Sequence, residues 1–186
     1  MVPAVLNRPC LFLLTIVLVL DVAATGISRV VADEKTPEAK AAIPAARQRT
    51  PEQASLEGDV LHDLMHDTLQ IVHHRYYKED EGLELPAGTL LEVFADIAQE
   101  HQVKLRWLVV EGQAMNSDHI AQDDFERAAV QALLTGKKKY DAIEGGVYRR
   151  AGPIVLSNVC LKCHVPDRRS TENRIAGLLI SIPVKK

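Results

Sequence analysis

The stretch Cys160-Leu161-Lys162-Cys163-His164 lies between two expected strands, at about 154–157 and 175–184, and the fold is expected to form around it. Two cysteines three positions apart with a histidine directly after the second form C-x-x-C-H, the pattern of covalent haem attachment. Each thiol can add to one haem vinyl group, and the histidine supplies an imidazole nitrogen to the iron. The motif therefore predicts one haem c per chain, with Cys160 and Cys163 as thioether anchors and His164 as the proximal ligand.

Three other interpretations of the motif stay open. A structural zinc site needs four Cys or His ligands, and the only other cysteine in the sequence is Cys10. A thioredoxin-like redox pair needs a C-x-x-C that opens a helix in a βαβ context. Pro166 and the polar run to Asn173 do not resemble that context. A chance occurrence of the motif is the third alternative.

The composition is that of an ordinary globular domain. The chain has 186 residues, of which 47% are hydrophobic and 25% charged, with a formal net charge of −3. This length suits one domain with a sizeable core. The slightly acidic balance and the absence of a basic stripe with interleaved aromatic residues argue against a nucleic-acid partner.

The N-terminal segment predicts export. Arg8 precedes the apolar run 11–20, and small residues follow before residue 32. This pattern is typical of a secretory signal peptide over residues 1–32, which would carry Cys10 away. An uncleaved membrane anchor is the alternative, but the run is short and Asp21 ends it. Because covalent haem attachment takes place outside the cytoplasm in bacteria, we expect a periplasmic or otherwise exported protein with no membrane span after cleavage.

Three segments are expected in the chain: the signal peptide, a flexible tether at 33–52 that is rich in Ala, Pro, Lys and Glu, and a haem domain at 53–186. Apolar periodicity predicts helices at about 51–77, 87–101 and 123–136. Thr89 and Glu92 form a possible capping box in the second helix. Strands are expected at about 103–110, 139–144, 147–150, 154–157 and 175–184, with a turn at Gly145-Gly146. The fold class is α+β, an antiparallel sheet with flanking helices.

The long N-terminal helix combines an apolar stripe with four histidines. The predicted stripe consists of Val60, Leu61, Leu64, Met65, Thr68, Ile71 and Val72. His62, His66 and His73 lie along one edge of the stripe, and His74 lies at the other. A homodimer through this helix is one expected assembly.

Four stretches carry a family resemblance: Asp124-Phe125-Glu126-Arg127-Ala128-Ala129, Tyr148 to Ile154, the C-x-x-C-H motif, and Ala176 to Pro183. Together, over about residues 103–184, the chain resembles the exported c-type haem proteins with a PAS-like domain, a family formerly catalogued as a domain of unknown function. The resemblance implies a five-stranded antiparallel PAS-like sheet, one covalent haem, and a sensor or redox role. It extends to Cys160, Cys163 and His164 among the site residues.

A low-spin c-type haem needs a second axial ligand, usually His or Met. The candidates are His62, Met65, His66, His73 and His74. We expect His73, and His66 as the second choice, because an edge-of-stripe histidine can face a pocket while its neighbours pack. A solvated surface position is the alternative for each histidine, and a core position for Met65.

Two further patterns bear on the site. His62-Asp63-Leu64-Met65-His66 resembles the metalloprotease H-E-x-x-H helix, but Asp63 replaces the glutamate base and no third ligand follows. Arg149 and Arg150 precede the motif and could pair with haem propionates; a solvated basic surface is the alternative.

Three functions remain open on the sequence. The first is a redox or small-gas sensing module, with a redox partner protein or a small gas as its partner. The second is an electron-transfer cytochrome c, in which two strong axial ligands hold the iron. The third is a peroxidase-like haem enzyme, which needs an open iron position and a distal acid–base group.

Overall fold

The computed structural model describes residues 49–165 and 167–185. The predicted signal peptide and residues 33–48 of the predicted tether lie outside this part of the chain. The described residues belong to one unit, which spans 41–186. Within them, no helix is both long enough and apolar enough to cross a bilayer.

Helices and strands do not follow the strict alternation along the chain that is typical of an α/β protein. In chain order they are α1 (Pro51–Arg75), η1 (Glu79–Glu81), α2 (Pro86–His101), β1 (Lys104–Leu108), η2 (Ser117–His119), α3 (Asp124–Leu134), β2 (Tyr140–Glu144), β3 (Val147–Leu156), α4 (Asn158–His164) and β4 (Arg174–Pro183). The predicted α+β class is confirmed. The helices predicted at 51–77 and 87–101 are also confirmed, and their ends differ by about two residues or fewer.

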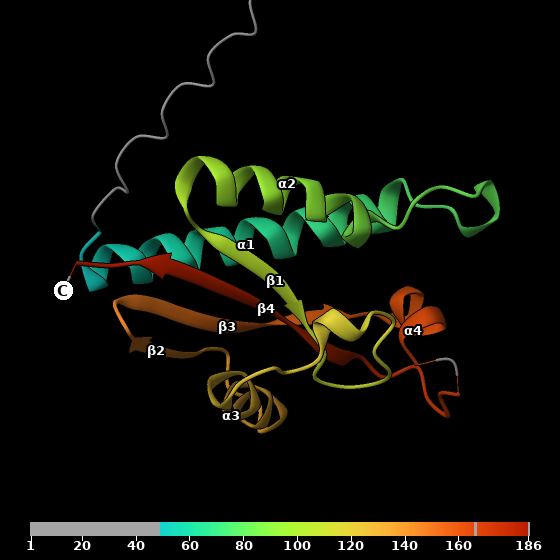
Figure 1. Cartoon of the computed structure of the whole chain (residues 1–186). Coiled ribbons are helices and arrows are strands. Elements are labelled where there is room, and N and C mark those ends of the chain that lie inside the picture. The colour runs from blue at the N-terminus through green and yellow to red at the C-terminus, as the bar shows by residue number, and fades with distance from the viewer. Residues whose placement is uncertain (1–48, 166, 186) are drawn as a thin grey trace, which may run out of the picture. The chain divides into compact units, whose positions relative to one another are not determined.

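The four described strands form one antiparallel sheet in the order β1-β4-β3-β2. Helices α1 and α2 cover one face of the sheet, α3 covers the other, and α4 lies at one end of it (Figure 1). Side chains alternate across the sheet: Leu178 and Ile180 belong to the core beneath α1 and α2, whereas Leu179 packs with α3. The sheet is therefore the middle of three layers, and α4 is attached where β3 ends.

The strand count corrects the five strands that the resemblance implied. The segments expected separately at 147–150 and 154–157 form the single strand β3, which pairs with β4 over its whole length. Strand β2 pairs with β3 only as far as Ala151. Pro153, which has no amide hydrogen to donate, therefore lies where β3 makes no hydrogen bonds to β2. Gly145 and Gly146, with φ of 58° and 83°, form the predicted turn between β2 and β3.

Residues 49–52, at the end of the predicted tether, form a β-bridge and the start of α1. Arg49 forms a parallel bridge with Val184, and Thr50 caps α1 by accepting a hydrogen bond from the Gln53 amide. The Gln53 side chain in turn accepts from the Thr50 amide, and Pro51 occupies the first turn. This capping box places the start of α1 within the stretch 33–52 that was expected to be a tether.

The buried face of α1 also differs from the predicted stripe. Its buried residues are Ala54, Gly58, His62, Met65 and Leu69. Val60 and Leu64 are instead 67% and 54% exposed. The five buried residues are spaced by three and four positions, so they lie along one face of the helix. Ala54 and Gly58 are small, which lets α1 pack closely against the sheet. In α2 the predicted capping box is absent: Leu85 is the N-cap, and the Thr89 hydroxyl donates to the Leu85 carbonyl.

Candidate functional site

Helix α4 presents the motif on one short element. Cys160 and Cys163 are three residues apart and therefore lie on neighbouring positions of one helix face. Leu161, which is 1% exposed, anchors the helix in the core, and the Arg168 guanidinium donates to the Leu161 carbonyl. Both thiols are free, and Cys163 is exposed. The helix thus holds two accessible thiols and His164 together at the end of β3.

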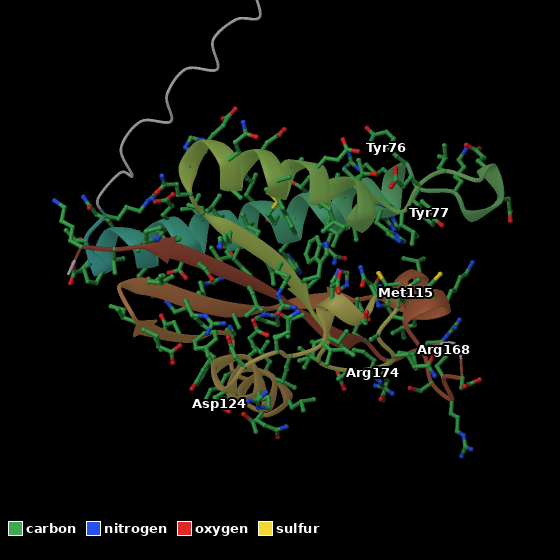
Figure 2. The ribbon with its side chains drawn as sticks, viewed as in Figure 1. Tyr76, Tyr77, Met115, Asp124, Arg168 and Arg174 are labelled. Atoms are coloured by element: carbon green, nitrogen blue, oxygen red, sulfur yellow. The ribbon has the colours of Figure 1, made fainter. Side chains whose placement is uncertain are left out.

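One cavity, here called the motif cavity, opens beside α4. It is lined by Cys160, Cys163 and His164 from α4, by His73 from α1 and Tyr77 just after it, and by Met115 from the loop after β1. Leu69, Pro86, Ile154 and Leu156 supply apolar walls. Tyr77 and Met115, both labelled in Figure 2, lie close to α4. The fold therefore brings residues from positions 69 to 164 around the motif.

His73 is the predicted distal residue that the structure places in this cavity. Its ring stacks at a tilt against Tyr77, with 4.9 Å between ring centroids. Burial lowers the pKa of His73, so the ring favours the neutral form that can coordinate a metal. Its Nδ1 atom is buried and has no hydrogen-bond partner. An unsatisfied buried nitrogen costs free energy, so this position of His73 is not explained by hydrogen bonding within the protein.

The other predicted distal residues have different surroundings. His62 is buried away from the motif cavity, where its Nε2 atom donates to the Pro153 carbonyl at 3.1 Å. His66 contacts Asp67 through Nδ1 at 3.0 Å and does not line the cavity. Met65 is 6% exposed and belongs to the core. His74 is exposed and, together with Cys160, lines a separate groove rather than the motif cavity. Among the five candidates, the structure therefore brings His73 alone to the motif cavity.

A histidine that the sequence analysis missed, His119, lies on the other side of His164. A second cavity is lined by His119, His164, Trp107 and Glu111, among others. Burial lowers the pKa of His164, and the nearby charges of His73 and His119 add to this effect. His119 belongs to η2, in a segment expected to be an irregular loop, so no periodicity marked it. Its position depends on how the loop folds back over β1.

The loop from residue 109 to 122 is fastened to the motif by its backbone. The Gln113 amide donates to the His164 carbonyl at 3.2 Å. Gly112 has a φ of 86°, and a Cβ atom at this position would lie 2.6 Å from the same carbonyl oxygen. Only glycine fits both the conformation and the space. The close approach at Gly112 explains how Met115 and His119 come to lie beside α4.

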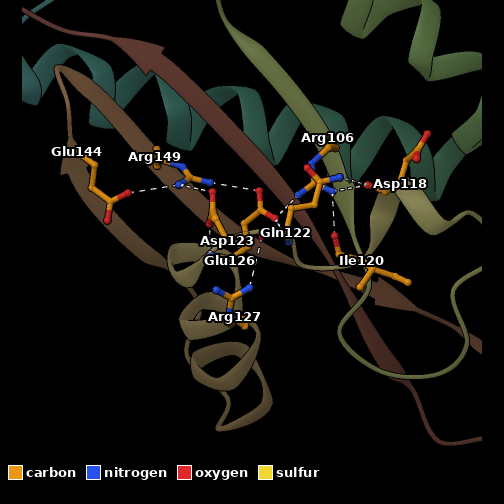
Figure 3. Close-up of polar contacts among 9 residues, drawn as sticks. All are labelled: Arg106, Asp118, Ile120, Gln122, Asp123, Glu126, Arg127, Glu144 and Arg149. Carbon is orange, nitrogen blue, oxygen red and sulfur yellow. Dashed lines mark hydrogen bonds and ion pairs between the residues drawn. The ribbon is translucent and has the colours of Figure 1, made fainter.

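Arg149 and Arg150 are not near the motif. Arg149 pairs with Asp123 at 2.8 Å and with the buried Glu126 at 3.2 Å, on the α3 side of the sheet (Figure 3). Arg150 is 4% exposed and pairs with Asp59 of α1 at 3.0 Å. Neither arginine lines either cavity beside α4. Because successive positions of β3 point to opposite faces of the sheet, the two guanidiniums pair with different carboxylates. The expected propionate contact finds no support in this geometry.

The structure also bears on the alternatives for the motif. Strands β3 and β4, which flank α4, pair antiparallel, so the motif does not lie in the parallel βαβ unit of a thioredoxin. No group of three His, Cys, Asp or Glu side chains within 49–165 and 167–185 is arranged to hold a metal ion. The geometry therefore supports neither a thioredoxin-like pair nor a zinc centre built from protein ligands alone.

The residues around the motif cavity fit a haem. Two thiols lie within one helical turn, and His73 and His164 offer two neutral imidazoles. The walls are apolar, as a porphyrin requires, and His73 lies among them. This donor set is the observation on which the fit rests.

Comparisons with known proteins agree on a family. The Tll0287-like family model matches residues 32–178. The fold is similar to the crystal structure of the cyanobacterial heme-protein Tll0287, with a TM-score of 0.53 and 15% sequence identity over 74% of this chain and 99% of that chain. No curated protein sequence matches the chain. The family match covers more of the N-terminal half than the resemblance described above. This chain belongs to the Tll0287-like family.

Proposed function

We propose that the chain is an exported protein that binds one haem c and works as a redox or small-gas sensing module. The observation that carries the proposal is the meeting of the C-x-x-C-H motif and His73 in one apolar cavity. The similarity of the fold to the cyanobacterial heme-protein Tll0287 supports the proposal. The periplasmic location rests on the N-terminal segment and on the chemistry of haem attachment.

Each residue of the proposed site has a separate task. The Cys160 and Cys163 sulfurs would hold the haem covalently, and His164 would supply one nitrogen to the iron. His73, which lines the same cavity, would supply a second nitrogen. Leu69, Ile154 and Leu156 exclude water from the space between these ligands. The bound group would supply one-electron redox chemistry, and the protein tunes it through the axial ligands and burial.

The second candidate is an electron-transfer cytochrome. The specific observation in its favour is that His73 is held in a long capped helix and ring-stacked on Tyr77. A distal ligand held this firmly would keep the iron six-coordinate in both oxidation states. Sensing of a gas requires instead that the distal ligand be displaced.

The cofactor is tested with the full chain exported from a host that has haem-attachment machinery. The wild-type protein should show a reduced-minus-oxidised haem spectrum that survives acid–acetone extraction. Cys163→Ala should lose covalent haem, because one thioether bond is missing. A wild-type protein without a Soret band would overturn the proposal.

The distal ligand is tested by His73→Ala, which should keep the covalent haem and change its low-spin spectrum. His74→Ala, one position along the same helix but exposed, is the matched control and should leave the spectrum unchanged. An unchanged spectrum in His73→Ala would show that His73 is not the ligand.

Carbon monoxide separates the two candidate functions. A ferrous spectrum that shifts on CO addition means a displaceable distal ligand and supports sensing. A ferrous spectrum unmoved by CO means two firm protein ligands and favours electron transfer.

A further inference from the structure

Met115 is a large apolar residue that the fold leaves out of the core. Its side chain is 53% exposed, yet it lines the motif cavity together with His73, Cys163 and His164. The other methionine in the described part of the chain, Met65, is 6% exposed and packs in the core. A thioether is, after imidazole, the commonest second axial ligand in c-type haem proteins. Met115 therefore has the chemistry of an iron ligand and lines the cavity that holds the motif.

The loop that carries Met115 is fastened on both sides of it. On one side, Gly112 and Gln113 contact the His164 carbonyl. On the other side, the Val109 amide donates to the His119 carbonyl at 2.8 Å, and the Arg106 guanidinium donates to the carbonyls of Asp118 and Ile120. Between these anchors the segment from 114 to 116 has no regular structure. Met115 can change position without breaking a helix or strand.

His73 and Met115 differ in this mobility and in their chemistry. His73 belongs to a 25-residue helix that is capped at its start and packed on the sheet. Its neutral imidazole suits ferric iron. Methionine ligation raises the reduction potential of a haem, which means that the thioether stabilises ferrous iron relative to ferric iron. The cavity thus offers a donor for each oxidation state.

We infer that Met115 is a second distal ligand that exchanges with His73 when the iron is reduced; this inference rests on the proposed haem site. A one-electron donor, such as a reduced redox protein, converts iron(III) to iron(II). The bond from the iron to the His73 nitrogen breaks, and a bond to the Met115 sulfur forms. Both donors use a neutral lone pair, so no proton has to move. The exchange moves the segment 114–116 between its two anchors and gives the redox change a structural readout.

The experiment compares haem-loaded wild-type, Met115→Leu and His73→Ala proteins by absorption, by magnetic circular dichroism and by potentiometric titration. Met115→Leu should keep the wild-type ferric spectrum, change the ferrous spectrum and lower the reduction potential. His73→Ala should show a thioether-to-iron charge-transfer band in the ferric state, because Met115 then occupies the free position. That band should be absent from the double variant.

Met65→Leu is the matched control, because it removes a thioether from the core rather than from the cavity. Its spectra and potential should be those of the wild type. Identical spectra and potential in Met115→Leu and wild type, in both oxidation states, would overturn the inference while leaving the haem site intact. A wild-type protein that lacks covalent haem would overturn the proposed function itself.

Discussion

Gly152 and His62 are in closer contact than any larger residue would permit. A Cβ atom at position 152 would lie 2.5 Å from both Cδ2 and Nε2 of the His62 ring. The same nitrogen donates to the Pro153 carbonyl at 3.1 Å. The histidine therefore fixes α1 against β3 just before the strand reaches the motif. This structural role explains why His62 is not available as an iron ligand.

We expect Gly152→Ala to destabilise the fold by about 2 kcal/mol, because the His62 ring must move from its hydrogen bond. Urea denaturation followed by circular dichroism measures the free energy of unfolding. The control is Gly88→Ala in α2, where the nearest neighbour of a Cβ lies 3.6 Å away. This control should be neutral or slightly stabilising, since alanine favours a helix. Equal stability of Gly152→Ala and wild type would contradict the close contact.

His62 also predicts a pH dependence. Burial lowers the pKa of His62 from its ordinary value of 6.5, and this effect exceeds the opposing hydrogen bond with Asp63. The unfolded chain therefore binds the proton more readily than the folded chain. The free energy of unfolding should fall as the pH falls below about 6.5 and through the folded-state pKa.

Urea denaturation of wild type and His62→Gln at about pH 7.5 and about pH 5 measures this effect. His62→Gln keeps a donor for the Pro153 carbonyl but cannot titrate, so it should lose less stability on acidification. His74→Gln, which changes an exposed histidine, should retain the wild-type loss. Equal losses in all three proteins would show that His62 does not titrate differently on folding.

The start of α3 joins three elements through one buried carboxylate. Glu126, whose side chain is 6% exposed, pairs with Arg106 of β1 and with Arg149 of β3. It also accepts a hydrogen bond from the Gln122 amide at 2.6 Å. The Arg106 guanidinium in turn donates hydrogen bonds to the carbonyls of Asp118 and Ile120, on either side of His119 (Figure 3). Through this network, α3 fixes the loop whose other end touches the motif.

Glu126→Gln should cost about 3 kcal/mol of unfolding free energy, because two partly buried guanidiniums lose their shared negative charge. Chemical denaturation provides the measurement. Glu144→Gln removes a carboxylate 3.3 Å from the same Arg149, but at a side chain that is 53% exposed. That control should cost less than about 1 kcal/mol. A similar small cost for Glu126→Gln would mean that the network contributes little.

In the described part of the molecule, β3 and β4 form the centre of the sheet, and the motif lies at its end. β4 pairs with β1 on one side and with β3 on the other, and core residues cover both of its faces. The motif cavity, by contrast, is enclosed by the C-terminal half of α1, the loop 109–122 and α4. These segments contact the sheet less extensively than the central strands do.

Hydrogen exchange should reflect this difference. The amides of β3 and β4 should be the slowest to exchange in protein with or without haem, because they lie in the two-sided core. Haem loading should slow exchange in residues 69–77, 109–122 and 158–164, since a bound partner stabilises the segments that contact it. Exchange in these segments that does not change on loading would contradict the placement of the haem in the motif cavity.

Much of the local structure follows from the sequence alone. The apolar periodicity predicted the long helices and the strand at β1, and the glycine pair predicted the turn at 145–146, because these signals act within a few residues. The C-x-x-C-H motif identified its own three residues for the same reason. The capping box predicted at Thr89 and Glu92, by contrast, is absent. The continuity of β3 through Gly152-Pro153 was missed, because it depends on which neighbouring strand ends first.

The tertiary structure decided what surrounds the motif. The sequence ranked His73 first among five candidates, but it is the packing of α1, which buries His62 instead of Leu64, that brings His73 to the cavity beside α4. Arg149 is adjacent to Arg150 in sequence, but the alternation of the strand sends the two to different carboxylates. Met115 and His119 reach the site because Gly112 lets the loop touch the His164 backbone. Such contacts join residues that are 23 to 91 positions apart, and their free energy exists only once the sheet has formed.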